Sequence, residues 1–297
     1  MRFAVTGSSG LIGTALCGSL AADGHELVRL VRRPVAAPDE VQWDPSQGRL
    51  DAHELEGVDA VVNLAGVAAG GQRWTDAYKR VILSSRANAT RTVAETIAKL
   101  DSPPKVMVSV SGVGFYGDDH GAEMLNEEEP PGTSFLATVC EEWESAAQPA
   151  ADADIAVCYP RIGIVMSPKG GALARMLPWF RAGLGGPLAG GDHYWSHVSL
   201  VDTVRALRFL METSGCIGPY NLTAPEPVTQ AEFARVLARA LRRPLLFPVP
   251  AIALQVRYGE FAVHLLSSLR VFPDRLIEAG FTFDHVTARE VVAAALR

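Results

Sequence analysis

The chain has 297 residues, a mass of 31.7 kDa and a formal net charge of -6. Apolar residues make up 48% and charged residues 20%, an ordinary balance for a soluble globular protein. The acidic net charge argues against a nucleic-acid-binding protein, which needs a concentrated basic face, and no window is apolar for long enough to cross a membrane.

Short runs rich in valine, isoleucine and leucine alternate with segments of helical period in the first part of the chain. The predicted strands are Phe3–Thr6, Glu26–Val31, Ala60–Leu64, Val106–Val110 and Ile155–Tyr159. The clearest predicted helices are Leu11–Ala22, Asp76–Leu100 and Ser134–Ala147. This alternation is typical of a parallel sheet with helices on both faces. It predicts an α/β fold, a Rossmann-type doubly wound parallel sheet.

The pattern loosens after Ser167, where a helix-like segment lies between glycine-rich ends, as expected of an insertion that borders a cleft. We therefore predict two units. Residues 1–167 form the Rossmann domain, and residues 168–297 form mainly a smaller C-terminal substrate lobe, with some return to the Rossmann sheet. The later predicted elements are the helices Asp202–Thr213, Thr229–Arg242 and Ala288–Leu296 and the strand Tyr220–Thr223.

The glycine-rich stretch "FAVTGSSGLIG" directly follows the first predicted strand and opens the first helix. Gly7 permits the tight turn, Gly10 lets the backbone approach a pyrophosphate, and Gly13 lets the helix pack closely on the strand. A glycine-rich turn without a ligand is the alternative, but both the position and the strand–helix context favour dinucleotide binding. The predicted cofactor contacts in this stretch are Gly7, Ser9, Gly10, Leu11, Ile12 and Gly13.

The end of the second strand bears on the choice of cofactor. An NAD-binding protein usually carries an acidic residue there, on the ribose 2′-hydroxyl. This strand instead ends in "LVRLVRRP", with Arg32 and Arg33 and no acidic residue before Asp39. Guanidinium groups suit a 2′-phosphate, although arginines after a strand can also be simply solvated. The sequence therefore favours NADP(H) over NAD.

Several further segments carry a family resemblance that runs nearly from end to end. They include "TGSSGLIGTAL", "DAVVNLAG", "SGVGFYG", "EEWESAA", "PRIGIVMSPKGGAL" and the tail "GEFAVHLLSSLRVFPDRLIEAGFTF". In these segments the chain resembles the extended and atypical short-chain dehydrogenase/reductases. More narrowly, it resembles the nucleoside-diphosphate-sugar-epimerase-like family that ends in a C-terminal domain of unknown function.

The resemblance implies two further cofactor contacts. Leu64, Ala65 and Gly66 of "NLAG" would pass beside the adenine and ribose, although close helix packing would equally explain these small residues. Arg161 of "PRIGIV" would lie near the nicotinamide end. It follows an apolar run and would be costly to bury without a partner, so a phosphate or a structural carboxylate is expected beside it.

The resemblance also shows where the sequence departs from the family. Extended enzymes of this superfamily use a serine or threonine before a "VYG"-like segment, and a Tyr-x-x-x-Lys pair on the next helix. Aligned on Glu144, this chain has Leu136 at the tyrosine position and Cys140 at the lysine position, so the standard proton relay is absent. We expect Leu136 and Cys140 to be cleft-wall or packing residues.

Two weaker catalytic candidates remain, Tyr116 and Ser111. Tyr116 follows the fourth predicted strand and could supply a phenolic proton, although a packed or ligand-contacting tyrosine is the more common case. Ser111 could bind substrate or cofactor, or merely satisfy backbone groups at the strand end. His193 and His197 have the spacing of a metal-ligand pair, but no helix or third ligand supports one, so no metal is predicted.

These observations predict an NADP(H)-dependent oxidoreductase or nucleotide-sugar-epimerase-like protein with a non-standard proton route. The alternative is a cofactor-binding sensor or scaffold that has lost turnover. The expected partner is a small molecule, with a nucleotide sugar among the candidates; a homodimer is left open, and neither nucleic acid nor membrane is expected. The four cysteines lack paired spacing and are expected to be buried thiols in a reducing compartment, the cytoplasm.

Overall fold

A parallel sheet forms the centre of the computed structural model, which describes residues 1–117 and 119–297. Its strands run in the order β12-β8-β5-β4-β1-β2-β3, and every neighbouring pair in this order is parallel. The predicted doubly wound α/β fold is confirmed. The strands are β1 Arg2–Thr6, β2 Glu26–Val31, β3 Glu40–Gln42, β4 Ala60–Asn63, β5 Val106–Ser109, β8 Ala156–Ile162 and β12 Gly218–Leu222, and the short β6 Ser111–Gly112 also pairs with β8.

The direction of winding reverses between β1 and β4. From β1 the chain builds outward through β2 and β3, and it then crosses to β4 and builds the other way through β5 and β8. In folds of this kind, ligands bind outside the carboxyl ends of the strands at this reversal. The ends of β1 and β4 are therefore the expected cofactor site, and they are the ends of the "FAVTG" and "VVNLAG" segments.

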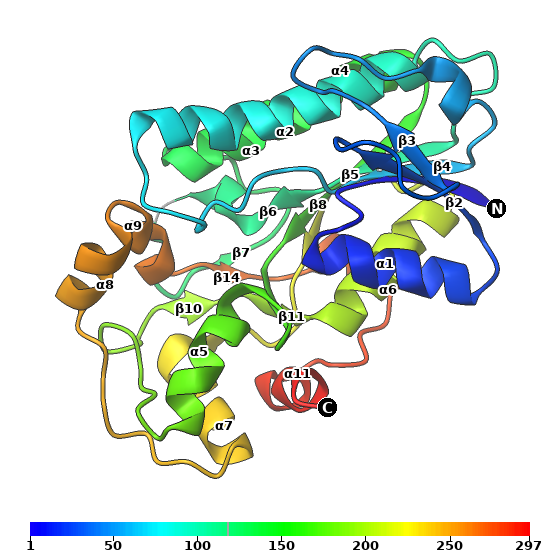
Figure 1. Ribbon diagram of the computed structural model, residues 1–297. Helices are drawn as coiled ribbons and strands as arrows, with labels where there is room; N and C mark the ends of the chain where they lie inside the picture. Colours follow the sequence, from blue (N-terminus) through cyan, green and yellow to red (C-terminus); the bar gives the residue numbers. More distant parts are fainter. Residues whose placement is uncertain (118) are drawn as a thin grey trace.

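Helices cover both faces of the sheet (Figure 1). Helices α1 (Leu11–Ala22) and α6 (Leu200–Glu212) lie on one face, and α2 (Asp76–Ile97), α3 (Phe135–Ser145) and α4 (Gln148–Asp152) lie on the other. Successive strand side chains point to opposite faces, so neighbouring strand residues belong to different cores. Phe3 packs in the core under α1 and α6, whereas Ala4 packs in the core under α2.

The C-terminal lobe has a third core, formed mainly by three helices: α5 (Gly171–Arg181), α7 (Gln230–Ala240) and α11 (Ala288–Ala295). Both α7 and α11 begin with a capping box, in which a threonine and a glutamate satisfy the first backbone amides. The remaining short elements of the chain are η1 Ala52–Leu55, η2 Val113–Tyr116, β7 Met124–Leu125, β9 Ile164–Met166, β10 Tyr194–Trp195, β11 His197–Ser199, β13 Val228–Thr229, α8 Ala251–Tyr258, α9 Phe261–Leu266, β14 Arg270–Val271 and α10 Asp274–Glu278.

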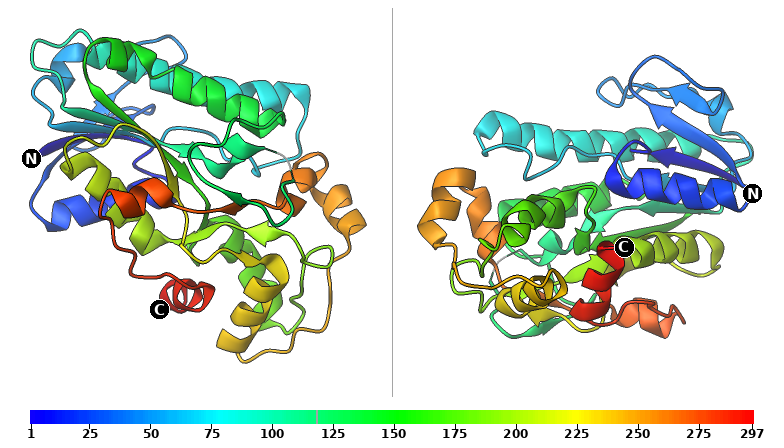
Figure 2. Two further views of the ribbon diagram at one scale, coloured as in Figure 1. Left: turned by 180° about the vertical axis from the view of Figure 1, so that it is seen from behind. Right: turned by 60° about the horizontal axis from the view of Figure 1, so that its bottom comes forward.

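The chain passes back and forth between the two halves of the molecule. After β9, α5 and β10 it returns through α6 and β12 to the Rossmann sheet, and then leaves again for α7 (Figure 2). The division of the chain near Ser167 stays a prediction. All four cysteines are free and buried, as expected from their spacing. No helix in the described part of the chain is both long and apolar enough to cross a bilayer.

Candidate functional site

The glycine-rich turn between β1 and α1 is shaped so that only glycine fits at two of its positions. Gly7 has φ +63°, and a Cβ there would lie 2.7 Å from the carbonyl oxygen of Leu64. A Cβ at Gly13 would lie 2.2 Å from the carbonyl oxygen of Gly7. A Cβ at Gly10 would meet the same oxygen at 3.2 Å, and the amide of Gly10 donates to it at 2.9 Å. The turn thus leaves open backbone at the N-terminus of α1, where a pyrophosphate is favoured.

A buried hydrogen-bond network fixes the "NLAG" segment against this turn. The hydroxyl of Thr6 donates to Oδ1 of Asn63 at 2.7 Å and accepts from the amides of Leu64 and Ala65 at 2.9 and 3.1 Å. The amide nitrogen Nδ2 of Asn63 donates to the hydroxyl of Thr90 on α2 at 2.7 Å. The structure therefore brings together the two segments that the sequence placed beside the cofactor, and it does so at the reversal of the sheet.

The two arginines after β2 differ in their surroundings. Both terminal nitrogens of Arg33 donate to the carboxylate of Glu40, at 2.8 and 2.5 Å. Within the described residues, no hydrogen bond or ion pair engages the guanidinium of Arg32, which borders a hollow of about 520 Å³ beside β3. Of the two predicted phosphate ligands, Arg32 is thus the one with unused donors.

Arg161 lies on β8 and is buried, with only 4% of its surface exposed. Its Nε and Nη2 donate to the two carboxylate oxygens of Glu144 on α3 at 2.9 and 3.0 Å, and its Nη1 donates to the hydroxyl of Tyr116 at 3.2 Å. Of the two partners expected from the sequence, the structure shows the structural carboxylate. Three of the five N–H donors of Arg161 are thus engaged inside the protein, and the nicotinamide contact that the resemblance implied stays a prediction.

The two catalytic candidates are both buried. The hydroxyl of Tyr116, which has no exposed surface, donates to Oδ1 of Asn221 at 2.7 Å. Burial raises the pKa of Tyr116 to about 12, against the lowering effect of Arg161. This placement favours the packed-tyrosine alternative. The hydroxyl of Ser111 is buried without a hydrogen-bond partner among the described residues, and its role toward a ligand stays a prediction.

The residues at the missing relay positions lie as the sequence suggested. Leu136 lines a large cavity, and Cys140 packs with Phe115 and Tyr116 in a small core. Burial raises the pKa of the Cys140 thiol to about 11, so a thiol rather than a thiolate stands at the position of the family lysine. Leu136 has no ionisable group, and the neutral thiol of Cys140 lacks the positive charge of the family lysine.

One residue of this region, Arg86 on α2, was not anticipated from the sequence. A Cβ at Gly66 would lie 3.1 Å from its Cγ and 3.2 Å from its Cζ, so the side chain lies directly against the end of "NLAG". Its guanidinium is 4.9 Å from the ring centre of Trp143, and it donates to the carbonyl oxygen of Ile82 at 3.1 Å. Burial lowers the pKa of Arg86. No ion pair engages it in the described part of the chain, so its charge is half-buried and uncompensated. Its spacing from Ile82 could have indicated this position, because residues four apart lie on the same face of a helix and Ile82 packs against the protein interior.

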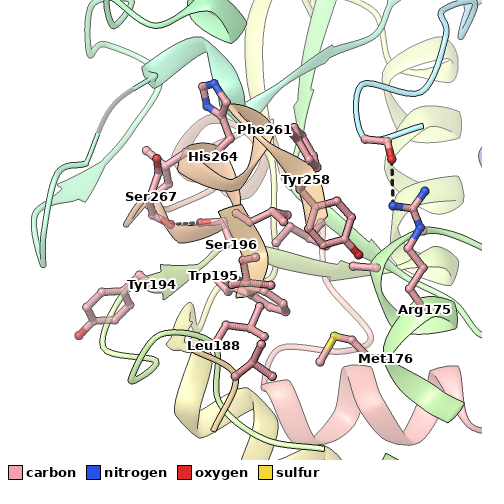
Figure 3. Close-up of a pocket in the computed structure, with 18 of the residues that line it drawn as sticks. Arg175, Met176, Leu188, Tyr194, Trp195, Ser196, Tyr258, Phe261, His264 and Ser267 are labelled. Atoms are coloured by element: carbon pink, nitrogen blue, oxygen red, sulfur yellow. Dashed lines mark hydrogen bonds between the residues drawn. The ribbon is translucent and has the colours of Figure 1, made fainter. Parts of the chain in front are cut away.

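A cavity of about 810 Å³ opens beyond the "NLAG" segment, between the Rossmann domain and the C-terminal lobe (Figure 3). Ala68 and Gly70 form the wall nearest to "NLAG", and Leu136 faces it from α3. Two aromatic residues that lie between His193 and His197 in the sequence, Tyr194 and Trp195, line the cavity. His197 instead is buried and bonded through Nδ1 to the carbonyl oxygen of Trp195 at 3.0 Å.

Comparisons with known proteins agree with this geometry. The model of the NAD dependent epimerase/dehydratase family matches residues 3–222, and a domain of unknown function, DUF1731, matches residues 249–295. The chain belongs to this epimerase family. The dinucleotide-binding fold and the family resemblance are thereby confirmed.

Individual relatives extend over the whole chain. The epimerase family protein Mb2239 of Mycobacterium bovis is 42% identical over 98% of this chain and 96% of its own length. The crystal structure of human epimerase family protein SDR39U1 (isoform 2) with NADPH has a TM-score of 0.91 and 32% identity, and covers 100% of this chain and 99% of that one. The nucleoside-diphosphate sugar epimerase from Corynebacterium glutamicum has a TM-score of 0.81 and 33% identity, covering 100% of this chain and 58% of that one.

Proposed function

We propose that this protein binds NADP(H) at the reversal of the sheet and works as an oxidoreductase or epimerase-like enzyme without a Tyr-x-x-x-Lys relay. The observation that carries the proposal is the turn between β1 and α1, where a side chain at Gly7 or Gly13 would collide with the backbone. Such a turn, set against a helix N-terminus, suits a pyrophosphate. NADP(H), when bound there, supplies a hydride donor or acceptor. The similar human protein was crystallised with NADPH.

In this proposal Arg32 holds the 2′-phosphate, and Arg33 orders the loop after β2 through its two bonds to Glu40. A 2′-phosphate adds negative charge and acceptor oxygens next to the end of β2, and a guanidinium binds such oxygens in pairs. The donors of Arg32, which no described residue engages, and its position just after β2 support this assignment.

Arg86 is proposed to supply the positive charge that the family lysine supplies on the ribose side of the site. Its side chain lies against Gly66, and its charge is near enough to act on the thiol of Cys140, which stands at the lysine position. A half-buried cation without a carboxylate is costly, and the hydroxyls or phosphates of a bound cofactor would offset that cost.

The second candidate function is a sensor that binds NADP(H) without turning it over. Leu136 and Cys140 at the relay positions favour it, because they supply neither the phenol nor the positive charge of the standard relay. The cavity of about 810 Å³ beside the cofactor site favours an enzyme, because a sensor of the cofactor alone has no need of a second binding space. Both candidate functions include a cytoplasmic location, which the four free cysteines support.

Calorimetric titration with NADPH and NADH tests the cofactor assignment. The wild type should bind NADPH more tightly, and Arg32→Ala should weaken NADPH binding by on the order of tenfold to a hundredfold, the worth of a charge-assisted hydrogen bond. NADH affinity should not change. Arg33→Ala is the matched control and should have a smaller effect, because Glu40 already engages its donors. Equal affinities of the wild type for both cofactors would rule out the assignment. Consumption of NADPH with carbonyl substrates then separates the enzyme from the sensor.

A further inference from the structure

The cavity beside the cofactor site has walls that differ from what a nucleotide sugar requires. Of the described residues that line it, most are aliphatic, aromatic or glycine, and only Arg175 carries a permanent charge, with His264 as the one other ionisable cation. No lining residue in the described ranges is acidic. Large apolar side chains from every side point into the space, among them Met176, Leu188 and Trp195 (Figure 3).

Two of the polar groups on the walls are already engaged within the protein. The hydroxyl of Ser196 donates to the carbonyl oxygen of Leu269 at 2.7 Å and accepts from the amide of Val271 at 2.8 Å. The guanidinium of Arg175 is exposed at the edge and donates to the carbonyl oxygen of Gly70 at 2.9 Å. Tyr194 and Tyr258, each with a hydroxyl, also line the cavity. With so few polar side chains, a diphosphate and a ring of sugar hydroxyls would lose their water here without enough partners to replace it, which is costly.

The mouth of the cavity is apolar as well. Trp179 is 62% exposed, Phe247 is 53% exposed and Leu184 is 49% exposed, and all three line the cavity. Exposed aromatic and aliphatic surface that continues into a cavity marks a binding site for an apolar partner. Among the described residues that line the cavity, Arg175 is the one permanent cation; it is exposed, and its guanidinium lies against Gly70.

From these observations we infer that the cavity binds an apolar small molecule with one anionic end, such as a fatty carboxylate or an apolar ring carboxylate, and not a nucleotide sugar. The apolar body fills the space between Met176, Leu188 and Phe261, and the acidic group meets the exposed guanidinium of Arg175. This inference rests on the proposed function in one respect, that the space beside "NLAG" serves the substrate of the cofactor-binding site.

Calorimetry with saturating NADPH and three probes tests it: sodium decanoate, 1-decanol and UDP-glucose. Decanoate and decanol should bind with dissociation constants on the order of 10–100 μM, because about nine methylene and methyl groups leave water. UDP-glucose should give no binding heat at the same concentrations. Tighter binding of UDP-glucose than of decanoate would overturn the inference, and so would the absence of binding by both decanoate and decanol.

Three variants make the test specific to the cavity. Met176→Glu places a carboxylate among the apolar walls and should weaken decanoate binding by at least about tenfold. Ile252→Glu is the matched control, because Ile252 is 65% exposed on α8 and does not line the cavity; it should leave binding unchanged. Arg175→Ala should weaken decanoate about threefold and leave decanol unchanged, as expected of an exposed ion pair. An unchanged decanoate affinity in Met176→Glu would contradict the inference.

NADPH affinity, measured in the same samples, keeps the two proposals apart. It should stay within about twofold of wild type in all three variants, because none of these residues belongs to the cofactor cradle, the glycine-rich turn together with "NLAG". Retained NADPH binding also shows that the variants are folded. If the wild type bound decanoate but did not bind NADPH, the proposed function would be refuted and the cavity assignment would stand.

Discussion

At the scale of single residues, Arg86 is a cation that forms no ion pair with any carboxylate among the described residues. Its neighbours are the aromatic ring of Trp143, a carbonyl oxygen of its own helix and the backbone of Gly66. Cation–π contact compensates part of the cost of burying a guanidinium, but a charged or hydroxylated ligand compensates more of it. This imbalance is the physical reason for placing Arg86 in the cofactor site.

Replacing Arg86 tests that placement. Arg86→Met keeps the length and packing of the side chain and removes the charge, so NADPH affinity should fall by on the order of tenfold or more. Arg86→Lys should recover part of the loss. Arg91→Met, on the exposed face of the same helix, is the control and should bind NADPH as the wild type does. The proposed role fails if Arg86→Met and Arg91→Met bind NADPH equally well.

Tyr116 provides a second test at this scale, because its two possible roles predict different measurements. If the tyrosine is a packing residue, Tyr116→Phe leaves Asn221 Oδ1 and one donor of Arg161 without a partner. The free energy of unfolding in urea should then fall by about 1–3 kcal/mol, while any turnover is kept. A general acid would instead show a loss of turnover of roughly 10²–10⁴-fold. Tyr159→Phe, at a tyrosine that is half-buried and not fully buried, is the control and should cost less stability. A loss of turnover without a loss of stability would restore Tyr116 as a catalytic candidate.

At the scale of elements, two glycines of the turn between β1 and α1 have different roles, one toward the cofactor and one in packing α1 on β1. A Cβ at Gly10 approaches one oxygen at 3.2 Å, whereas a Cβ at Gly13 overlaps three backbone atoms of Gly7 and Ser8, at 2.2 to 2.9 Å. Gly10→Val should therefore leave thermal unfolding near that of the wild type and abolish NADPH binding, because its side chain occupies the approach of the pyrophosphate. Gly13→Val should lower the unfolding temperature, because α1 can no longer pack on β1. Unchanged NADPH affinity in Gly10→Val would show that the cofactor binds elsewhere.

Local sequence signals predicted the bounds of some elements and not of others. Strand β2 and helix α1 begin and end at the predicted residues, because their apolar periods and the glycines that bound them are local signals. Strand β8 was predicted to end at Tyr159, yet it continues through Pro160 and Arg161 to Ile162. Proline and a charged residue normally end a buried strand. Here the charge is neutralised by Glu144, from a helix seventeen residues earlier, and local pattern carries no information on that pairing.

The residues of the candidate site also differ in whether the sequence could locate them. Spacing located the glycine turn, because backbone shape depends on local sequence, and the family resemblance located "NLAG". The sequence did not distinguish Arg32 from Arg33, since the difference is the bidentate pair that Glu40 forms with one of them. It also missed Arg86, since an arginine on α2 becomes part of the site only when α2 packs beside the end of β4. Both facts belong to tertiary structure.

At the scale of the whole molecule, the C-terminal lobe closes the cavity through a helical arm, defined here as α8 and α9. The arm lies beside the start of α2, as Figure 1 shows. The ring of Phe261 packs 5.4 Å from that of Trp74, an arginine nitrogen of Arg73 donates to the carbonyl oxygen of Val256 at 3.0 Å, and Lys79 pairs with Glu260. These few contacts, with exposed polar components, are the connection by which the arm holds one wall of the cavity against the Rossmann domain.

Weakening this connection should affect the cavity and spare the cofactor site. Phe261→Ala removes the ring that contacts both Trp74 and Gly70, so the arm should open locally more often and its amides should exchange faster with deuterium. Decanoate affinity should fall about tenfold, because the open form lacks one wall, whereas NADPH affinity should stay within about twofold. Val263→Ala, at a 61% exposed position of the same helix that does not line the cavity, is the matched control. If Phe261→Ala weakened NADPH binding as much as decanoate binding, the arm would have to act on the cofactor cradle itself. That result would contradict a structure in which, among the described residues, the contacts that hold the turn come from β1, α1 and the end of β4.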